Sequence, residues 1–199
     1  MVKFLLSTST YVPGSRLLIT PGKNKSAKIG VVRGQQFAID NGAFGGFDEQ
    51  RFLSTIRIYE PYRSNCLFVV VPDIVGDAVS TLQLFDDWCH RLSGWSLAYV
   101  AQDGAEDLPI PADCSTVFIG GSTEWKESMA AVSVIKRAQS IGKRIHIGRV
   151  NWGRRYRLFV VLAGSEHFTC DGTRQRFDGL ENTLSDWRHY EAQKPLISI

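Results

Sequence analysis

The chain has 199 residues, of which 44% are hydrophobic, and its formal net charge is +3. This length and composition suit one domain with a buried core, and we expect residues 1–199 to form a single domain. So small a net charge does not by itself indicate a nucleic-acid-binding protein. No apolar run of about 18 residues occurs, and residues 1–6 are too short for the core of a signal peptide, so we expect a cytoplasmic protein without a membrane span.

The four cysteines indicate neither a metal site nor a disulfide framework. They are Cys66, Cys89, Cys114 and Cys170, and no pair of them has C-x-x-C spacing. Zinc sites and disulfide-rich domains place cysteines at short, regular spacings. We therefore expect free thiols, no bound metal and no cofactor.

The N-terminal part of the chain mixes apolar and polar segments. Residues 2–7 predict a first buried strand, and residues 8–33 predict a loop or an irregular hairpin around one apolar patch. Residues 37–40 predict the next strand, which leads into a helix with Asp48 as its N-cap.

The rest of the chain repeats a buried strand, a turn and an amphipathic helix. One of these helices is expected to bury Trp125, Met129 and Val132 on its inner face. This alternation predicts a mainly parallel sheet covered by helices. The remaining predicted strands are residues 67–71, 97–101, 117–119, 144–147 and 167–170.

The fold that we predict is an α/β protein with a (β/α)8 barrel of the TIM type. Glycine-rich turns follow most of the predicted strands, and no G-x-G-x-x-G or P-loop motif favours a Rossmann sheet. Such barrels typically need ~250 residues and rarely fewer than ~200. This barrel must therefore be minimal, with short helices or an incomplete eighth unit.

Polar residues or glycines follow most of the predicted strands. In a parallel barrel all of these strand ends face one side, so we expect them to meet at one rim. Each aspartate taken alone is also explained as an ordinary cap of a turn. The residues at the strand ends are Asp40, Asp73, Gln102, Gly120, Gly121, Asn151 and Asp171.

Three carboxylates, an amide and exposed glycine backbone suit a polar, planar ligand. A carboxylate accepts hydrogen bonds and glutamine both donates and accepts them, so Asp73 and Gln102 match the edge of a purine. The glycines at 120–121 carry no side chain that would cover their amides, which are expected to be open to a ring oxygen. Asp40 and Asp171 match glycosidic-bond chemistry, in which one acid attacks the sugar carbon and the other moves a proton.

A basic cluster surrounds the end of the strand predicted at 144–147. Arginines with aromatic residues between them suit phosphate contacts beside a stacking surface. A solvated helix face explains the same composition equally well. The cluster comprises Arg144, Arg149, Arg154, Arg155 and Arg157, with Trp152 and Tyr156 interleaved.

Six short segments occur in an order that is more specific than any one of them. They are Ile39-Asp40-Asn41-Gly42, Val71-Pro72-Asp73, Ala101-Gln102, Ile119-Gly120-Gly121, Gly148-Arg149-Val150-Asn151 with Arg154-Arg155, and Cys170-Asp171-Gly172-Thr173. In this order the chain resembles the tRNA-guanine transglycosylase superfamily. It resembles more closely the DNA-guanine transglycosylase branch of 7-deazaguanine DNA modification, found in phages and in bacterial DNA-modification clusters.

The resemblance implies the family's (β/α)8 barrel and its covalent exchange of a base. It implies Asp171 as the nucleophile and Asp40 as the general acid/base. Our candidates for contacts with the nucleic acid are Arg149, Asn151, Arg154 and Arg155. The shell that recognises the base is implied to be Asp73, Gln102, Gly120 and Gly121.

Departures from the family pattern favour the DNA-acting branch. The tRNA enzymes carry a cysteine-rich zinc-binding segment with a histidine ligand after the nucleophile, whereas residues 172–199 contain no cysteine and His189 stands alone there. Asn41 replaces the usual serine and Gly42-Ala43 the usual Gly-Gly, so the first turn of the pocket is expected to differ.

Three interpretations stay open. The leading one is an enzyme that exchanges guanine in DNA for a 7-deazaguanine such as preQ0 through a covalent glycosyl-aspartate. Its partners would be DNA and the free base, in the host cytoplasm if the chain is phage-encoded. The second is the same reaction on tRNA. The third is a non-catalytic barrel that binds a purine or a nucleic acid, in which Asp40 and Asp171 only cap turns.

Overall fold

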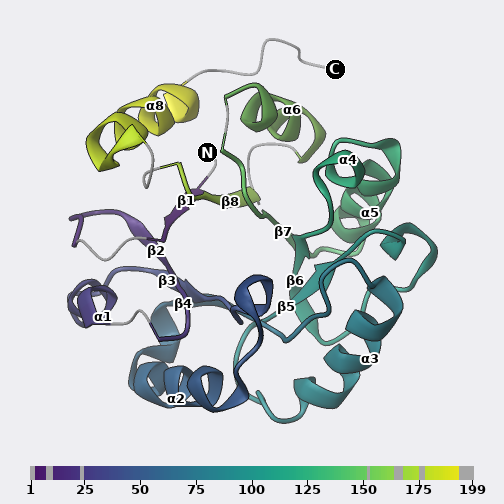
Figure 1. Ribbon diagram of the computed structural model, residues 1–199, viewed down its shortest axis with the longest axis horizontal. Helices are drawn as coiled ribbons and strands as arrows, with labels where there is room; N and C mark the ends of the chain where they lie inside the picture. Colours follow the sequence, from purple (N-terminus) through teal and green to yellow (C-terminus); the bar gives the residue numbers. More distant parts are fainter. Residues whose placement is uncertain are drawn as a thin grey trace.

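Eight parallel strands form a closed barrel that is surrounded by helices (Figure 1). The computed structural model describes residues 3–7, 11–22, 25–151, 153–163, 168–174 and 178–192. Each strand pairs with the next one along the chain, and β8 (Phe168–Gly172) pairs in parallel with β1 (Lys3–Leu6) to close the ring. The predicted α/β barrel is confirmed, and its eighth strand is present.

Short strands allow this barrel to be built from few residues. Their lengths range from three residues in β3 to six residues in β6. The connection from β5 to β6 contains the 3-10 turn η3 (Ala105–Asp107) in place of a helix. The other strands are β2 (Arg16–Ile19), β3 (Phe37–Ile39), β4 (Cys66–Val70), β5 (Leu97–Ala101), β6 (Cys114–Ile119) and β7 (Arg144–Ile147).

The helices lie on the outside of the ring (Figure 1). Asp48 caps α2 as predicted, because its side chain accepts a hydrogen bond from the amide of Arg51 at 3.0 Å. The α-helices are α1 (Lys25–Val32), α2 (Glu49–Tyr59), α3 (Ala78–Cys89), α4 (Thr123–Lys126), α5 (Met129–Ser140), α6 (Gly153–Ala163) and α8 (Leu180–Ala192). Two further 3-10 turns are η1 (Ala43–Gly45) and η2 (Glu60–Asn65).

The prediction of a loop or irregular hairpin over residues 8–33 is wrong. This range contains β2, which pairs in parallel with both β1 and β3, and the whole of α1, which follows it. The apolar patch at residues 17–19 is fully buried and is itself the strand. The polar residues on both sides of this short strand obscured its pattern in the sequence. In the structure, the polar loop before β2 is held by the side chain of Gln35, which donates to the carbonyls of Val12 and Ser15.

The single helix predicted to bury Trp125 and Met129 is two helices. Ser128 breaks it, since its hydroxyl accepts from the amide of Ala130 and so caps a new helix, α5. A serine hydroxyl satisfies one of the free amides at a helix start, which favours a boundary there. Trp125 is buried as expected, but Met129 is 75% exposed and is not part of the core.

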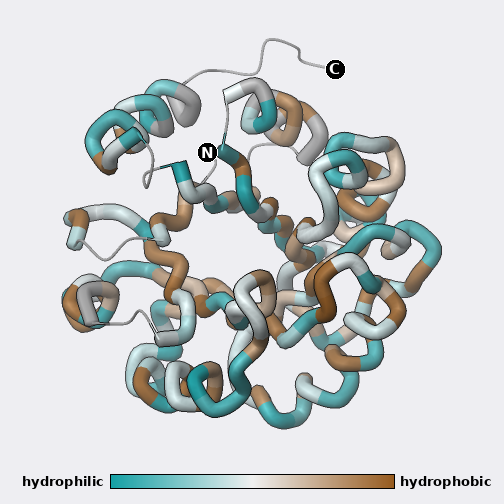
Figure 2. The backbone as a smooth tube through the Cα atoms, in the orientation of Figure 1, coloured by the Kyte–Doolittle hydropathy of each residue, from teal (hydrophilic) through white to brown (hydrophobic). Residues whose placement is uncertain are grey.

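Alternate residues of each strand point into the barrel and out toward the helices. Ala38 belongs to the inner apolar set, whereas its neighbours Phe37 and Ile39 pack in the outer core with the helices. This alternation follows from the period of two in a strand. Apolar segments line the ring in Figure 2, while hydrophilic segments concentrate on the outer helices. The inner set comprises Leu5, Leu18, Ala38, Phe68, Val70, Ala98 and Val100.

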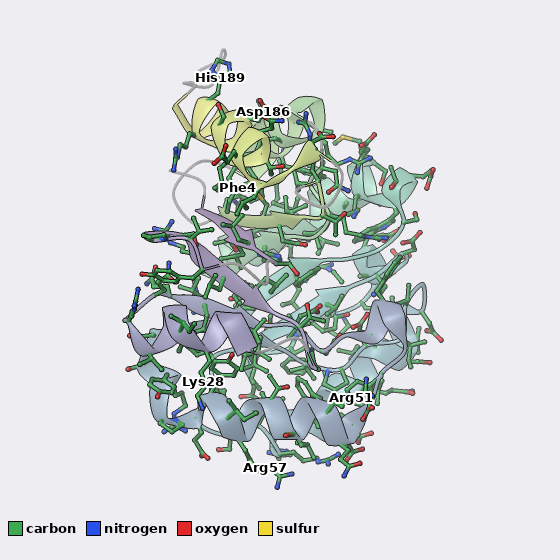
Figure 3. All side chains as sticks on the ribbon, turned by 60° about the vertical axis from the view of Figure 1, so that its left-hand side comes forward. Phe4, Lys28, Arg51, Arg57, Asp186 and His189 are labelled. Atoms are coloured by element: carbon green, nitrogen blue, oxygen red, sulfur yellow. The ribbon has the colours of Figure 1, made fainter. Side chains whose placement is uncertain are left out.

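Tyr156 belongs to the core and not to a stacking surface for nucleic acid, so that part of the prediction is wrong. Its ring is 4% exposed and stacks on Phe4 of β1, with the ring centroids 5.2 Å apart. Figure 3 shows Phe4 inside the molecule, in contrast to Arg57 at the edge of α2. Arg144 does not join the basic cluster either, because it begins β7 at the opposite end of the strand from Arg149.

The described residues contain no helix that is long and apolar enough to cross a membrane. All four cysteines are free, as expected. Burial raises the pKa of the Cys66 thiol to about 12 and that of the Cys114 thiol to about 11. Both thiols therefore stay protonated at neutral pH and are poor nucleophiles.

The buried position of Tyr156 predicts a large effect on stability. Replacing it with alanine should lower the free energy of unfolding by about 3–5 kcal/mol, because the side chain leaves a cavity between α6 and β1. Tyr156→Phe retains the ring and should keep most of the stability. Urea unfolding of the three proteins measures the difference. Unchanged stability of Tyr156→Ala would contradict the core assignment.

Candidate active site

A cavity of about 390 Å³ opens at the carboxyl ends of the strands. All eight strand ends contribute to its wall, and η1 lies over the opening of the ring in Figure 1. Such a position at the carboxyl end of a parallel barrel is the usual place of the active site. The wall comprises Ser7, Leu18, Thr20, Asp40, Asn41, Gly42, Phe44, Gly45, Val70, Asp73, Val75, Val100, Gln102, Phe118, Gly120, Gly121, Gly148, Arg149, Asp171 and Thr173.

The alternation of the strands explains why polar residues meet in this cavity. Asp40 follows the inward-facing Ala38 by two residues, and Gln102 follows the inward-facing Val100 by two. The period of two thus carries the inward direction one step past the end of the strand. Apolar residues fill the lumen below, and the next inward position at the rim is polar in β1, β2, β3 and β5, where it is Ser7, Thr20, Asp40 and Gln102.

The cavity brings together most of the site residues predicted from the sequence. Its wall contains Asp40, Asp73, Gln102, Gly120, Gly121, Asp171 and Arg149. It does not contain Asn151, whose side chain accepts from the amide of Thr173 at 2.8 Å, or Arg155. The side chain of Arg154, and Trp152 as a whole, lie outside the described residues.

Asp73 is held by two amide side chains. Asn41 donates to its Oδ1 at 2.6 Å, and Gln102 donates to its Oδ2 at 2.6 Å. Burial raises the pKa of Asp73, and the two amide donors act in the opposite direction. Asn41 also donates to the carbonyl of Val71, so the network ties the end of β3 to the ends of β4 and β5. Asn41 was noted in the sequence only as a departure from a family pattern.

The amides of Gly120 and Gly121 are not open, which corrects one expectation. The amide of Gly120 donates to the carbonyl of Ala101 at 2.9 Å, and that of Gly121 donates to Oε1 of Gln102 at 3.0 Å. The side-chain oxygen of Gln102 therefore accepts from the backbone, and its side-chain nitrogen donates to Asp73. A Cβ on Gly120 would lie 2.7 Å from Val100, so this position requires glycine for packing.

Asp40 has the most perturbed carboxyl group of the site. Its pKa is raised from an ordinary 3.8 to about 7, first by burial and then by the negative charges of Asp171 and Asp73, while the amides of Gly42 and Asn41 act in the opposite direction. A carboxyl group that titrates near neutral pH can give and take a proton in the same reaction cycle. The three acids are thus close enough to influence one another.

Asp171 is 7% exposed and is gripped on one of its two oxygens. Its Oδ1 lies 3.1 Å from the amide of Arg149 and 3.2 Å from Nε2 of His146. Arg149 has a φ of 60°, a left-handed conformation that is uncommon for a residue other than glycine. This strained turn after β7 directs the amide of Arg149 toward Asp171.

Cationic groups gather behind the ends of β6 and β7. Lys126 is buried and donates to the carbonyl of Gly148 at 2.9 Å, and burial and the charge of Arg149 lower its pKa to about 8. Arg149 donates to the carbonyl of Gly121 at 2.7 Å, and Arg155 pairs with Glu127 at 2.7 Å. In this structure these cations therefore bind groups of the protein itself.

An exposed aromatic ring stands at the mouth of the cavity. Phe44 in η1 is 73% exposed and lines the pocket. The guanidinium of Arg149 lies over its ring, 4.7 Å from the centroid. An apolar side chain left so open beside a polar pocket offers a flat surface to a planar ligand.

Sequence reasoning missed His146, Phe44 and Lys126. His146 sits in the predicted strand Arg144-Ile-His-Ile, where its alternation with two isoleucines indicates that it faces the lumen. That signal was present in the sequence, since a polar residue between outward apolar residues of a barrel strand points inward. Phe44 and Lys126 carry no comparable signal, because their positions depend on turn geometry and helix packing.

No group of three or more histidine, cysteine, aspartate or glutamate side chains in the described parts of the chain is placed to hold a metal ion. A scan against models of protein families found no match, and a search of curated proteins found no relative.

The raised pKa of Asp40 predicts a pH-dependent stability. The folded protein binds this proton more tightly than the unfolded chain, so stability falls as the pH rises from about 4 to about 7 and the deficit then stays constant. Asp40→Asn cannot ionise and so avoids this loss of stability. At about pH 8 its free energy of unfolding, measured in urea, should exceed that of the wild type by roughly 2–4 kcal/mol. The gain should shrink at about pH 5.

Asp87→Asn is the matched control, because Asp87 lies on the exposed face of α3. It should change stability equally at both pH values. A gain for Asp40→Asn that does not depend on pH would show that Asp40 is ionised throughout this range.

Proposed function

We propose that this chain is a DNA-guanine transglycosylase, which exchanges guanine in DNA for a free 7-deazaguanine base of the preQ0 type. The observation that supports this proposal best is the pairing of Asp40 and Asp171 across one cavity. The two acids interact electrostatically, yet Asp40 has a pKa of about 7 and Asp171 is held by N–H donors. Two acids in different environments are the arrangement that base exchange at a glycosidic carbon requires.

The proposed reaction uses each acid twice. A carboxylate oxygen of Asp171 attacks C1′ of the target deoxyguanosine, the bond from C1′ to N9 breaks, and the proton of Asp40 goes to the departing guanine. Asp40, now ionised, takes the N9 proton of the incoming 7-deazaguanine. That nitrogen attacks C1′ and releases Asp171 as a carboxylate. Atoms and electrons balance without an added oxidant or reductant.

The base would lie between Phe44 and the network of Asp73 and Gln102. Asp73 retains lone pairs beyond those that Asn41 and Gln102 use, and the second N–H of Gln102 is not assigned to any contact among the described residues. The open ring of Phe44 suits stacking on a planar base. An N–H edge of guanine or of its 7-deaza analogue therefore fits the acceptor side of this network.

The polymer must present a base that has left its stack. A base inside a duplex cannot reach a cavity at the end of a barrel, so the enzyme flips it or takes single strands, at a cost of a few kcal/mol for flipping. Arg149 is the candidate nearest to the cavity for a sugar-phosphate contact. Arg155 would have to break its ion pair with Glu127 before it could bind a phosphate. A contact of Asn151 with the nucleic acid would compete with the hydrogen bond that its side chain accepts from the amide of Thr173.

Exchange of labelled guanine tests the nucleophile and the polymer together. We expect incorporation into DNA, loss of it in Asp171→Asn because a neutral amide cannot serve as this nucleophile, and retention of it in Asp113→Asn. Asp113 is an exposed residue that lies just before β6, at the opposite end of the barrel. Full exchange by Asp171→Asn would remove Asp171 from the mechanism.

Transfer RNA serves as the competing substrate in the same assay. The proposal expects DNA to be the better acceptor, an expectation that derives from the sequence resemblance and from the absence of cysteines in residues 172–199. Equal or faster incorporation into tRNA would replace the DNA assignment with the tRNA reaction. No incorporation into either polymer would favour a barrel that only binds a purine or a nucleic acid.

Gln102 is predicted to set the affinity for the free base. Gln102→Ala should raise the KM for the 7-deazaguanine by roughly 5- to 150-fold, the equivalent of ~1 to 3 kcal/mol for unpaired buried polar groups. It should also lower the stability, since Asp73 and the amide of Gly121 lose a partner. Gln83→Ala, on the exposed side of α3, is the matched control. An unchanged KM in a folded Gln102→Ala would restrict Gln102 to a structural role.

A further inference from the structure

His146 is a polar residue in the apolar lumen of the barrel. It is fully buried, and its ring packs between those of Phe68 and Phe118, at centroid distances of 5.0 and 4.5 Å. The parallel register of β7 and β8 places it beside Thr169. A polar ring in such surroundings costs free energy unless its nitrogens have hydrogen-bond partners, so its two contacts decide what it does.

The contacts of His146 form a chain from Thr169 to Asp171. Nδ1 lies 2.8 Å from the hydroxyl of Thr169, and Nε2 lies 3.2 Å from Oδ1 of Asp171. An ionised carboxylate only accepts hydrogen bonds, so Nε2 carries the hydrogen and Nδ1 accepts that of Thr169. The hydroxyl of Thr169 also lies 3.4 Å from the carbonyl of Ile145, which is the longer and weaker of its two contacts.

The two oxygens of Asp171 are therefore not equivalent. Oδ1 accepts from Nε2 of His146 and from the amide of Arg149. Among the described residues no hydrogen-bond donor contacts Oδ2, and Asp171 lines the cavity. A side chain gripped on one oxygen cannot rotate freely about χ2, since rotation would break both bonds.

We propose that His146 is a positioning residue that, together with Thr169, presents Oδ2 of Asp171 to the sugar. This inference rests on the proposed role of Asp171 as the nucleophile. Oδ2 forms the bond to C1′ as the bond to the base breaks, and Oδ1 becomes the carbonyl oxygen of the resulting ester. A carbonyl oxygen still accepts, so both hydrogen bonds persist through the reaction and no proton moves between His146 and Asp171.

The tautomer of His146 can be measured without any substrate. Long-range proton–nitrogen NMR of the ¹⁵N-labelled protein should show a protonated Nε2 and an unprotonated, accepting Nδ1. In Asp171→Asn the Nε2–H signal should move, whereas in Asp113→Asn it should stay in place. An unprotonated Nε2 in the wild type, or a signal insensitive to Asp171→Asn, would overturn the inference.

Variants of His146 separate positioning from simple packing. His146→Met fills a similar volume without a donor, and His146→Gln keeps an N–H donor near the position of Nε2. We expect His146→Met to slow single-turnover exchange by roughly 100-fold, with the KM for the free base unchanged, because misplacement of a reacting group affects the chemical step. His146→Gln should recover at least part of this rate.

Thr169 supplies a matched pair of milder changes. Thr169→Ser keeps the hydroxyl and should keep the Nε2–H tautomer, whereas Thr169→Val removes the donor to Nδ1 and should shift the Nδ1 resonance. A wild-type exchange rate in His146→Met, or equal losses in His146→Met and His146→Gln, would reduce His146 to a packing role. If the wild type shows no exchange while the NMR results are as expected, the proposed function fails but the hydrogen-bond chain stands.

Discussion

Closure of the eight-stranded ring determines which side chains meet at its carboxyl end. Because β1 pairs with β8, every strand has two neighbours, and the period of two assigns each residue to the lumen or to the helix side. Small residues such as Ala38 and Ala98 occupy inner positions, and polar residues such as Asp40 and Gln102 occupy inward positions at the rim. The cavity is thus a continuation of the barrel's own packing. A change that opened the ring between β1 and β8 would separate Asp171 from Asp40.

The cost of this arrangement is the gathering of three carboxyl groups in one small cavity. The structure limits the repulsion by giving each acid a different environment. Asp73 is held by Asn41 and Gln102, Asp171 is held by His146 and the amide of Arg149, and Asp40 keeps a raised pKa near neutrality. Acids whose environments push their pKa values apart take different roles in catalysis. In the proposed mechanism, Asp40 is the group that exchanges protons and Asp171 is the group that forms the bond to the sugar.

Much of the site could be predicted because it follows strands with strong signals. Continuous apolar runs marked β4 and β5, so Asp73 and Gln102 were assigned to the correct rim from the sequence. Other features depend on geometry that one sequence does not carry. Asn41 and Gln102 occupy the oxygens of Asp73, and the amides of residues 120–121 donate within the protein. Tyr156 looked like a surface residue among arginines, yet α6 turns it onto Phe4. The short β2 was missed because three buried residues between polar loops are too few for a clear pattern.

A covalent bond between Asp171 and the sugar would test the proposed chemistry most directly. The protein is incubated with a guanine-containing oligonucleotide, denatured, and analysed by intact mass and peptide mapping. The mechanism predicts a mass increase equal to the oligonucleotide minus one guanine, located on the peptide that contains Asp171, and its loss when free 7-deazaguanine is added before denaturation. An adduct on another residue, or no adduct under conditions that support base exchange, would contradict the assignment of Asp171 as the nucleophile.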